Sequence, residues 1–193
     1  PWFQQAVMIY LEGHTGKFTG ELLKGDFARR ASDTRSAFLR DLASMTAASK
    51  DKDDLDALLA SFRNSPGQLL WWKAALLEGL AQGLPKAGVR SLVEFANVPP
   101  PAPDDPRTEI PGLLARAGEI ISDPSLPDEL RIASMPLLSQ QPYETASPIL
   151  KELVSGKQPA TVSRAAFAIV RKHGAKKTSP LLYEILPSAN PAL

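Results

Sequence analysis

The chain of 193 residues contains no cysteine. Within these residues that absence excludes disulfides, thiolate nucleophiles, cysteine-ligated zinc and covalent attachment of c-type haem, and it leaves the redox compartment open. Histidine is scarce too, since His14 and His173 are the only two. The sequence also lacks the HExxH and GxSxG motifs, a phosphate-binding glycine loop and an acidic metal loop. It therefore predicts a protein that is not an enzyme, with no cofactor and no metal site.

An excess of one charge and long apolar runs are missing as well. The 22 basic residues are balanced by 21 acidic ones, which leaves a net charge of +1. This balance predicts neither a strong nucleic-acid footprint nor an acidic partner. The longest apolar runs, such as "LLWWKAALL" at 69–77, are short and contain Lys73. The sequence therefore predicts no helix that is inserted in a membrane.

Proline, in contrast, is abundant, with 18 residues, roughly twice the average frequency. Most prolines separate apolar runs that have helical spacing. Phe38, Leu39, Leu42 and Met45, for example, form one stripe behind Asp33, a candidate N-cap. No segment shows sustained period-two alternation, so the sequence predicts an all-α fold. We expect helices over residues 1–13, 17–32, 33–49, 51–65, 65–84, 86–97, 110–122, 126–140, 143–154, 159–174 and 176–191, with Pro136 and Pro187 interrupting the two in which they lie.

One proline cluster marks the main internal boundary. Five prolines lie between Val98 and Pro106, beside two adjacent aspartates. Such a segment is expected to be an extended, semi-rigid connector. The sequence thus predicts degenerate N-terminal helical repeats over 1–96, a connector over 97–109 and more regular repeats over 110–193, all continuous as one array.

The regular part repeats with a period in the middle thirties. Arg131 aligns with Arg164 at a spacing of 33, and Leu150 aligns with Leu182 at a spacing of 32. A period of this length holds two helices of about 12 residues. One such hairpin cannot bury its apolar face alone, so neighbouring hairpins must stack. We therefore expect an α-solenoid of HEAT-like hairpins, in which the arginine after each inter-helix turn reaches carbonyl groups or an acid of the adjacent repeat. A simple helical bundle is the alternative.

A closer resemblance rests on "PWFQQAV" at 1–7, "LLEGLAQGL" at 76–84 and the arginine–alanine heads of the repeats. In these loose motifs the chain resembles the helical segment of large membrane-associated dehydrogenases from planctomycete-type bacteria. In that family a β-propeller precedes a HEAT-like array, and a cytochrome c domain with a CxxCH haem site follows. The resemblance implies a spacer or docking segment in a periplasmic or membrane-associated protein. The chain itself contains neither CxxCH nor propeller strands, so these residues cannot carry the haem or sugar chemistry of the family.

Four features are candidate sites, each with a structural alternative. The acidic segment "DKDDLD" at 51–56 is interpreted as a helix start in preference to a metal cluster, because its acids favour the helix dipole. The glycines of "GLAQGLPKAG" at 79–88 lack the preceding strand of a phosphate site. His14 is interpreted as a loop side chain and, as the weaker alternative, a binding contact. His173 is interpreted as a surface or capping residue at a helix C-terminus, where a partly protonated imidazole suits the dipole, in preference to a ligand or base.

The candidate binding residues are one tryptophan and a basic segment. Trp71 is expected to be half exposed; packing is its first interpretation, and a contact anchor is the alternative. The segment "RKHGAKK" is the best basic patch and is interpreted as a solvated helix end, with contact to phosphate or anionic lipid as the alternative. Its candidate residues are Arg171, Lys172, Lys176 and Lys177.

Two functional hypotheses follow. The first is a non-catalytic α-solenoid scaffold that positions neighbouring domains or binds a partner protein, without nucleic acid. The second is a HEAT-type nucleic-acid-binding module like the HEAT-like DNA glycosylases, which requires basic residues gathered on one face. An enzymatic role is a third and weaker possibility.

The sequence opens inside an apolar helical pattern, "WFQQAVMIYLEG". We expect this helix to be the second of a hairpin whose first helix precedes the chain, as in a fragment of a larger array. Trp2 and Phe3 would then expose apolar surface or form an oligomer contact.

Overall fold

The computed structural model describes residues 10–11, 13–63 and 70–185. Within these ranges the chain forms ten α-helices and four 3₁₀ helices and contains no strand, which confirms the predicted all-α class. None of the helices described is long and apolar enough to cross a bilayer. The segment containing Trp2 and Phe3 lies outside the described residues, as does Pro187.

The chain divides into two compact units, Pro1–Leu113 and Leu114–Leu193. The division falls inside helix α7, Glu109–Ser122, just beyond the proline-rich segment. The described helices of the first unit are α2 Thr15–Lys24, η1 Asp26–Arg29, α3 Asp33–Ser49, α4 Lys52–Ala60, η2 Ser61–Arg63, α5 Trp71–Ala87, α6 Leu92–Asn97 and η3 Pro106–Thr108. After α7, the helices of the second are α8 Asp128–Ser134, η4 Met135–Gln140, α9 Tyr143–Val154, α10 Ala160–Lys172 and α11 Ala175–Ile185.

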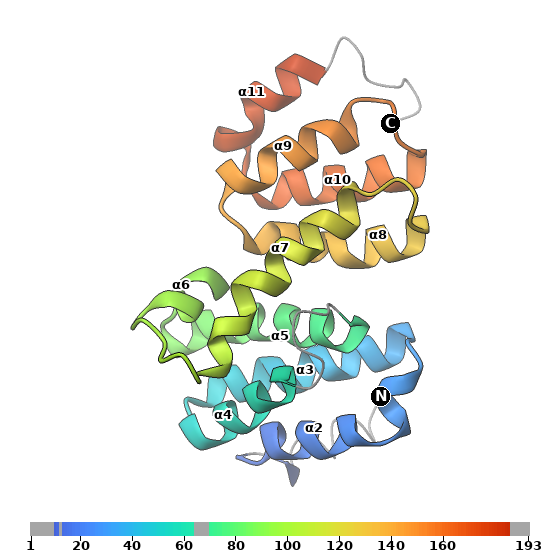
Figure 1. The fold of residues 1–193 in the computed structure, drawn as a ribbon. Coiled ribbons are helices and arrows are strands. Elements are labelled where there is room, and N and C mark those ends of the chain that lie inside the picture. Colours follow the sequence, from blue (N-terminus) through green and yellow to red (C-terminus); the bar gives the residue numbers. More distant parts are fainter. Residues whose placement is uncertain (1–9, 12, 64–69, 186–193) are drawn as a thin grey trace. The chain divides into compact units, whose positions relative to one another are not determined.

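In the first unit, α3 and α5 lie side by side (Figure 1). Their contact runs over Gly79 and Gly83, two glycines one helical turn apart on α5. A Cβ atom on Gly79 would lie 2.2 Å from the Arg40 carbonyl oxygen and 2.7 Å from the Ala43 Cβ, and Gly83 is equally close to the next turn of α3. The glycines of "LLEGLAQGL" therefore permit close packing of two helices. This packing role accounts for them without a phosphate-binding site.

In the second unit, side chains of α8 and α10 hold the helix that precedes each of them. Arg131 on α8 is 1% exposed, and its Nε donates to the Ile121 carbonyl of α7 at 2.9 Å. Ser163 on α10 is fully buried, and its Oγ donates to the Leu153 carbonyl of α9, also at 2.9 Å. Each donor stands ten residues after its acceptor. The two hydrogen bonds are thus equivalent at a spacing of 32 residues.

The predicted alignment pairs Arg131 with Arg164, whereas the two hydrogen bonds pair Arg131 with Ser163 at a spacing of 32 residues. Ser163, not Arg164, occupies the position of Arg131, and the Arg164 side chain is exposed. Pro127 and Pro159, also 32 residues apart, take the N-cap positions of α8 and α10, and Pro142 takes that of α9 with nearly the same dihedral angles. The spacing of 33 residues rests on the identity of Arg131 and Arg164. The buried side chain, however, is that of Ser163, the residue before Arg164.

Several helix boundaries also differ from the sequence expectation. Ser32, not Asp33, caps α3, because the Ser32 hydroxyl accepts a hydrogen bond from the Arg35 amide. The helix expected over 86–97 is limited to Leu92–Asn97, while α5 continues past Pro85 to Ala87. The predicted interruption at Pro136 is confirmed, since α8 ends at Ser134 and a 3₁₀ helix follows.

Candidate functional site

The acidic segment forms a helix start, as predicted. Asp51 is the N-cap of α4, and its Oδ1 accepts a hydrogen bond from the Asp54 amide at 3.1 Å. Asp54 itself is buried and contacts the first turn of α2. Its carboxylate accepts from the Gly16 amide at 2.9 Å, from the Lys17 amide at 3.2 Å and from the Thr15 hydroxyl at 2.9 Å. One aspartate therefore caps a helix remote in sequence, a role that its position in an acidic run could not reveal. Among the residues that the structure describes, no three or more histidines or acids are grouped to hold a metal ion.

Trp71 is partly buried and belongs to the packing of the first unit. Its indole Nε1 donates to the Ala28 carbonyl at 2.9 Å, and its ring lies 6.2 Å from the ring of Phe27, centroid to centroid. The indole thereby fixes η1 against the start of α5. Trp72 is buried in the core, as its position on the leucine face predicts.

Lys73 is a buried amine that sequence reasoning noted only as an interruption of an apolar run. It is fully buried, and its Nζ donates to the Phe62 carbonyl at 2.8 Å. Burial lowers the pKa of the Lys73 amine, and the carboxylate of Glu109 partly opposes this. Lys73 precedes Leu76 and Leu80 by three and seven residues, so helical periodicity already places it on the buried face. The amine stabilises the end of η2 and faces no cavity among those described below.

The two histidines lie in different settings. His14 is exposed at the N-cap position of α2 and makes no capping hydrogen bond through its side chain. His173 is the C-cap of α10 and is half buried, with its ring edge-on to Tyr143 at 5.5 Å. Burial lowers the pKa of His173, while a backbone hydrogen bond with Leu138 raises it. The capping position is as predicted, and burial of the ring favours the neutral form of the imidazole.

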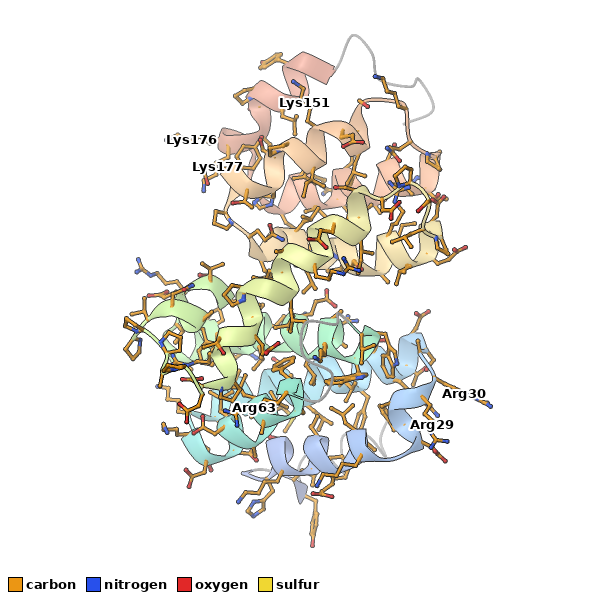
Figure 2. The ribbon with its side chains drawn as sticks, in the orientation of Figure 1. Arg29, Arg30, Arg63, Lys151, Lys176 and Lys177 are labelled. Carbon is orange, nitrogen blue, oxygen red and sulfur yellow. The ribbon has the colours of Figure 1, made fainter. Side chains whose placement is uncertain are left out.

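The basic segment surrounds the junction between α10 and α11. Arg171 and Lys172 are exposed in the last turn of α10, and Lys176 and Lys177 are exposed in the first turn of α11. Figure 2 shows Lys176 and Lys177 projecting outward from that turn. None of the four forms an ion pair within the part of the chain that the structure describes. We call this group of four cations the basic corner. The four cations lie on either side of one inter-helix junction, while Trp71 lies in the other unit.

The first unit also contains an open groove of about 570 Å³ between α4 and the proline-rich segment. Its apolar floor is formed by Leu55, Leu59 and Phe95. Two ion pairs flank the floor: Lys52 with Asp56 at 3.1 Å, and Arg107 with Asp105 at 2.7 Å. Arg63, labelled in Figure 2, and Asp104 complete a lining in which positive and negative charges balance. The groove therefore offers an apolar surface, and its lining has no excess of positive or negative charge.

Sequence reasoning missed the groove because its walls come from segments more than thirty residues apart. The basic corner, in contrast, can be recognised in the sequence because its four cations lie within one short segment. Comparison with protein-family models, with curated proteins and with solved structures finds no match to this chain.

Proposed function

We propose that the chain is a non-catalytic α-solenoid scaffold that positions neighbouring domains or binds a partner protein. The observation that supports it most is the repeated hydrogen bond of the second unit, from Arg131 and from Ser163 to carbonyls ten residues earlier. A polar anchor that recurs at a fixed period is typical of stacked helical hairpins, which present extended surfaces to partners. Membership of a larger bacterial dehydrogenase-like protein rests on the sequence resemblance alone.

The chemistry of the buried polar groups agrees with this proposal. Asp54, Lys73 and Arg131 are the buried ionisable side chains among the residues described. Each donates to or accepts from the backbone of another helix. In an enzyme, buried charged side chains would be expected to face the substrate. Here these three side chains join helices.

The test is to lengthen the array by one period. A second copy of residues 122–153, inserted after Leu153, would add 32 residues and keep the register of every anchor. We expect a monomer whose helical circular dichroism rises in proportion to the added residues and whose unfolding stays cooperative. A matched insertion of 122–151, two residues shorter, turns the next anchor by about 200° around the helix and should lose cooperativity. Loss of cooperative unfolding in both variants, or its retention in both, would contradict the repeat architecture on which the proposal rests.

A nucleic-acid-binding module is the second candidate, favoured by the basic corner alone. Binding of duplex DNA to such a module would weaken steeply as salt rises, because each neutralised phosphate releases counterions. Titration of the chain with a labelled duplex at low and at moderate salt measures this dependence. Absence of binding at low salt excludes the candidate.

A further inference from the structure

Charge is segregated along the second unit. From Leu153 to Tyr183 there are six basic residues and no acidic one: Lys157, Arg164, Arg171, Lys172, Lys176 and Lys177. From Leu114 to Glu152 there are three basic residues, Arg116, Arg131 and Lys151, and six acidic ones, Glu119, Asp123, Asp128, Glu129, Glu144 and Glu152. The second unit of the near-neutral chain is therefore cationic between Leu153 and Tyr183, a stretch bounded by Glu152 and Glu184, and is acidic before it.

Two of the four residues of the basic corner lie at a helix end where the helix dipole disfavours a positive charge. Arg171 and Lys172 lie at the C-terminal end of α10, where the helix dipole favours cations. Lys176 and Lys177 occupy the first turn of α11, where the dipole disfavours cations, and no acid is present in that turn. Both lysines are exposed and form no ion pair in the described chain. Residues that break a local rule without structural compensation are expected at functional positions.

An exposed aromatic side chain lies on the same helix. Tyr183 is 77% exposed and follows Lys176 by seven residues on α11. Seven residues turn an α-helix to within about 20° of the starting direction, so both side chains leave the same face. Tyrosine is enriched at protein interfaces because it combines apolar area with a hydroxyl. The helical phase of α11 thus places an aromatic side chain beside the basic segment.

We propose that the basic corner, together with Tyr183, binds a short acidic segment of a partner protein. Carboxylates complement the four unpaired cations, and Tyr183 offers an apolar contact beside them. A short ligand is favoured because the cationic stretch is limited to residues 153–183 and is bounded by Glu152 and Glu184. The inference rests on the proposed scaffold function, for which it names the class of partner.

The experiment uses the full chain and fluorescein-labelled hexaglutamate at low salt, with fluorescence anisotropy as the readout. The double variant Lys176→Gln/Lys177→Gln should bind the peptide roughly five- to tenfold more weakly than the parent chain, as expected for the loss of two exposed charge pairs. Lys157→Gln/Arg164→Gln is the matched control, since it removes the same charge from exposed, unpaired positions of the same unit. We expect less than a twofold change for the control. Tyr183→Ser should weaken binding by roughly twofold to fivefold, as for a partly exposed contact.

Three results would overturn the inference. The first is no hexaglutamate binding by the parent chain. The second is an equal loss in the control double variant, which would mean attraction by net charge alone. The third is tighter binding of an oligothymidylate or of phosphatidylserine vesicles than of the peptide. Circular dichroism confirms that each variant is folded. Each of these results leaves the insertion test of the scaffold unaffected, so the two proposals can fail separately.

Discussion

In both units side chains reach from one helix to the carbonyl groups of another, and in the first unit helices also approach one another over glycines. Gly79 and Gly83 let α5 contact the α3 backbone, and Gly16 does the same between α2 and α4. Arg131 and Ser163 instead span the distance between paired helices with a hydrogen bond. Adding a Cβ atom to a glycine in such a contact causes a clash. Removing the donor of a polar anchor leaves a buried carbonyl group without its hydrogen bond. The glycine contacts and the polar anchors should therefore respond to opposite kinds of substitution.

The largest effect is expected at the anchor of α8. Arg131→Met removes the donor to the Ile121 carbonyl and to the Gln158 side chain. It should lower the free energy of unfolding by about 3 kcal/mol, because buried acceptors are left without partners. Urea unfolding followed by circular dichroism measures this, since the second unit contains no tryptophan.

The companion substitutions test the 32-residue register. Ser163→Ala should cost about 1 kcal/mol, the usual contribution of one hydrogen bond. Arg164→Met, at an exposed position, should change stability by less than about 0.5 kcal/mol. A larger cost at Arg164 than at Ser163 would restore the alignment by arginine identity and refute the equivalence of the two anchors.

A loss smaller than that of Arg131→Met, but larger than that of Ser163→Ala, is expected at the glycine contact. Gly79→Ala forces a Cβ to within 2.2 Å of a backbone oxygen, and such overpacking should cost about 2 kcal/mol. Gly112, in the same unit and also helical, meets nothing within 4 Å. Gly112→Ala should therefore stabilise the chain by about 0.5–1 kcal/mol through helix propensity. Urea unfolding monitored by tryptophan fluorescence reports on this unit, and a stabilising Gly79→Ala would contradict the close contact.

The cap between α4 and α2 should contribute somewhat less. Asp54→Asn keeps the size of the side chain but replaces one acceptor oxygen by a donor, so part of the cap on Gly16 and Thr15 is lost. We expect destabilisation of about 1–2 kcal/mol in the same fluorescence assay. Asp53→Asn is the control, because Asp53 is exposed in the same turn, and its effect should not exceed about 0.5 kcal/mol.

The smallest effect concerns pH and the second unit. Burial holds the pKa of His173 below its ordinary value of 6.5, against a backbone hydrogen bond with Leu138 and the nearby Glu144. Below pH 6.5 the unfolded chain therefore binds a proton that the folded chain does not, so stability falls as pH falls through this range. His173→Gln should make the stability less dependent on pH between 6.5 and the lower folded pKa. Urea unfolding at a series of pH values measures the slope, and an unchanged slope would show that His173 is not its origin. The pKa values of three carboxyl groups, Glu94, Asp105 and Asp123, are also lowered. They affect the stability in a separate pH range, below about pH 4.

Sequence reasoning was sufficient wherever one helix could be considered alone. The apolar stripes placed Leu39, Leu42 and Leu76 in the core, where they are fully buried. The acidic run was correctly assigned to a helix start, and Pro136 to a helix end. It failed where the partner of a residue is far along the chain. Nothing local distinguishes Asp54 from Asp53, or Ser163 from its neighbours, because burial against another helix separates them.

The basic segment shows the same division. The sequence alone identified Arg171 to Lys177 as cationic, but the structure decided that two of its lysines oppose a helix dipole and share a helix with an exposed tyrosine.

The sequence by itself determined the helical class, the apolar faces and the capping of α4, because these depend on periodicity and on hydrogen bonds within a few residues. Only the tertiary structure decided the glycine contacts, the anchors of α8 and α10 and the groove beside α4. Those features depend on the distance between helices, and that distance is set by side chains that are remote in sequence and meet only when the chain packs.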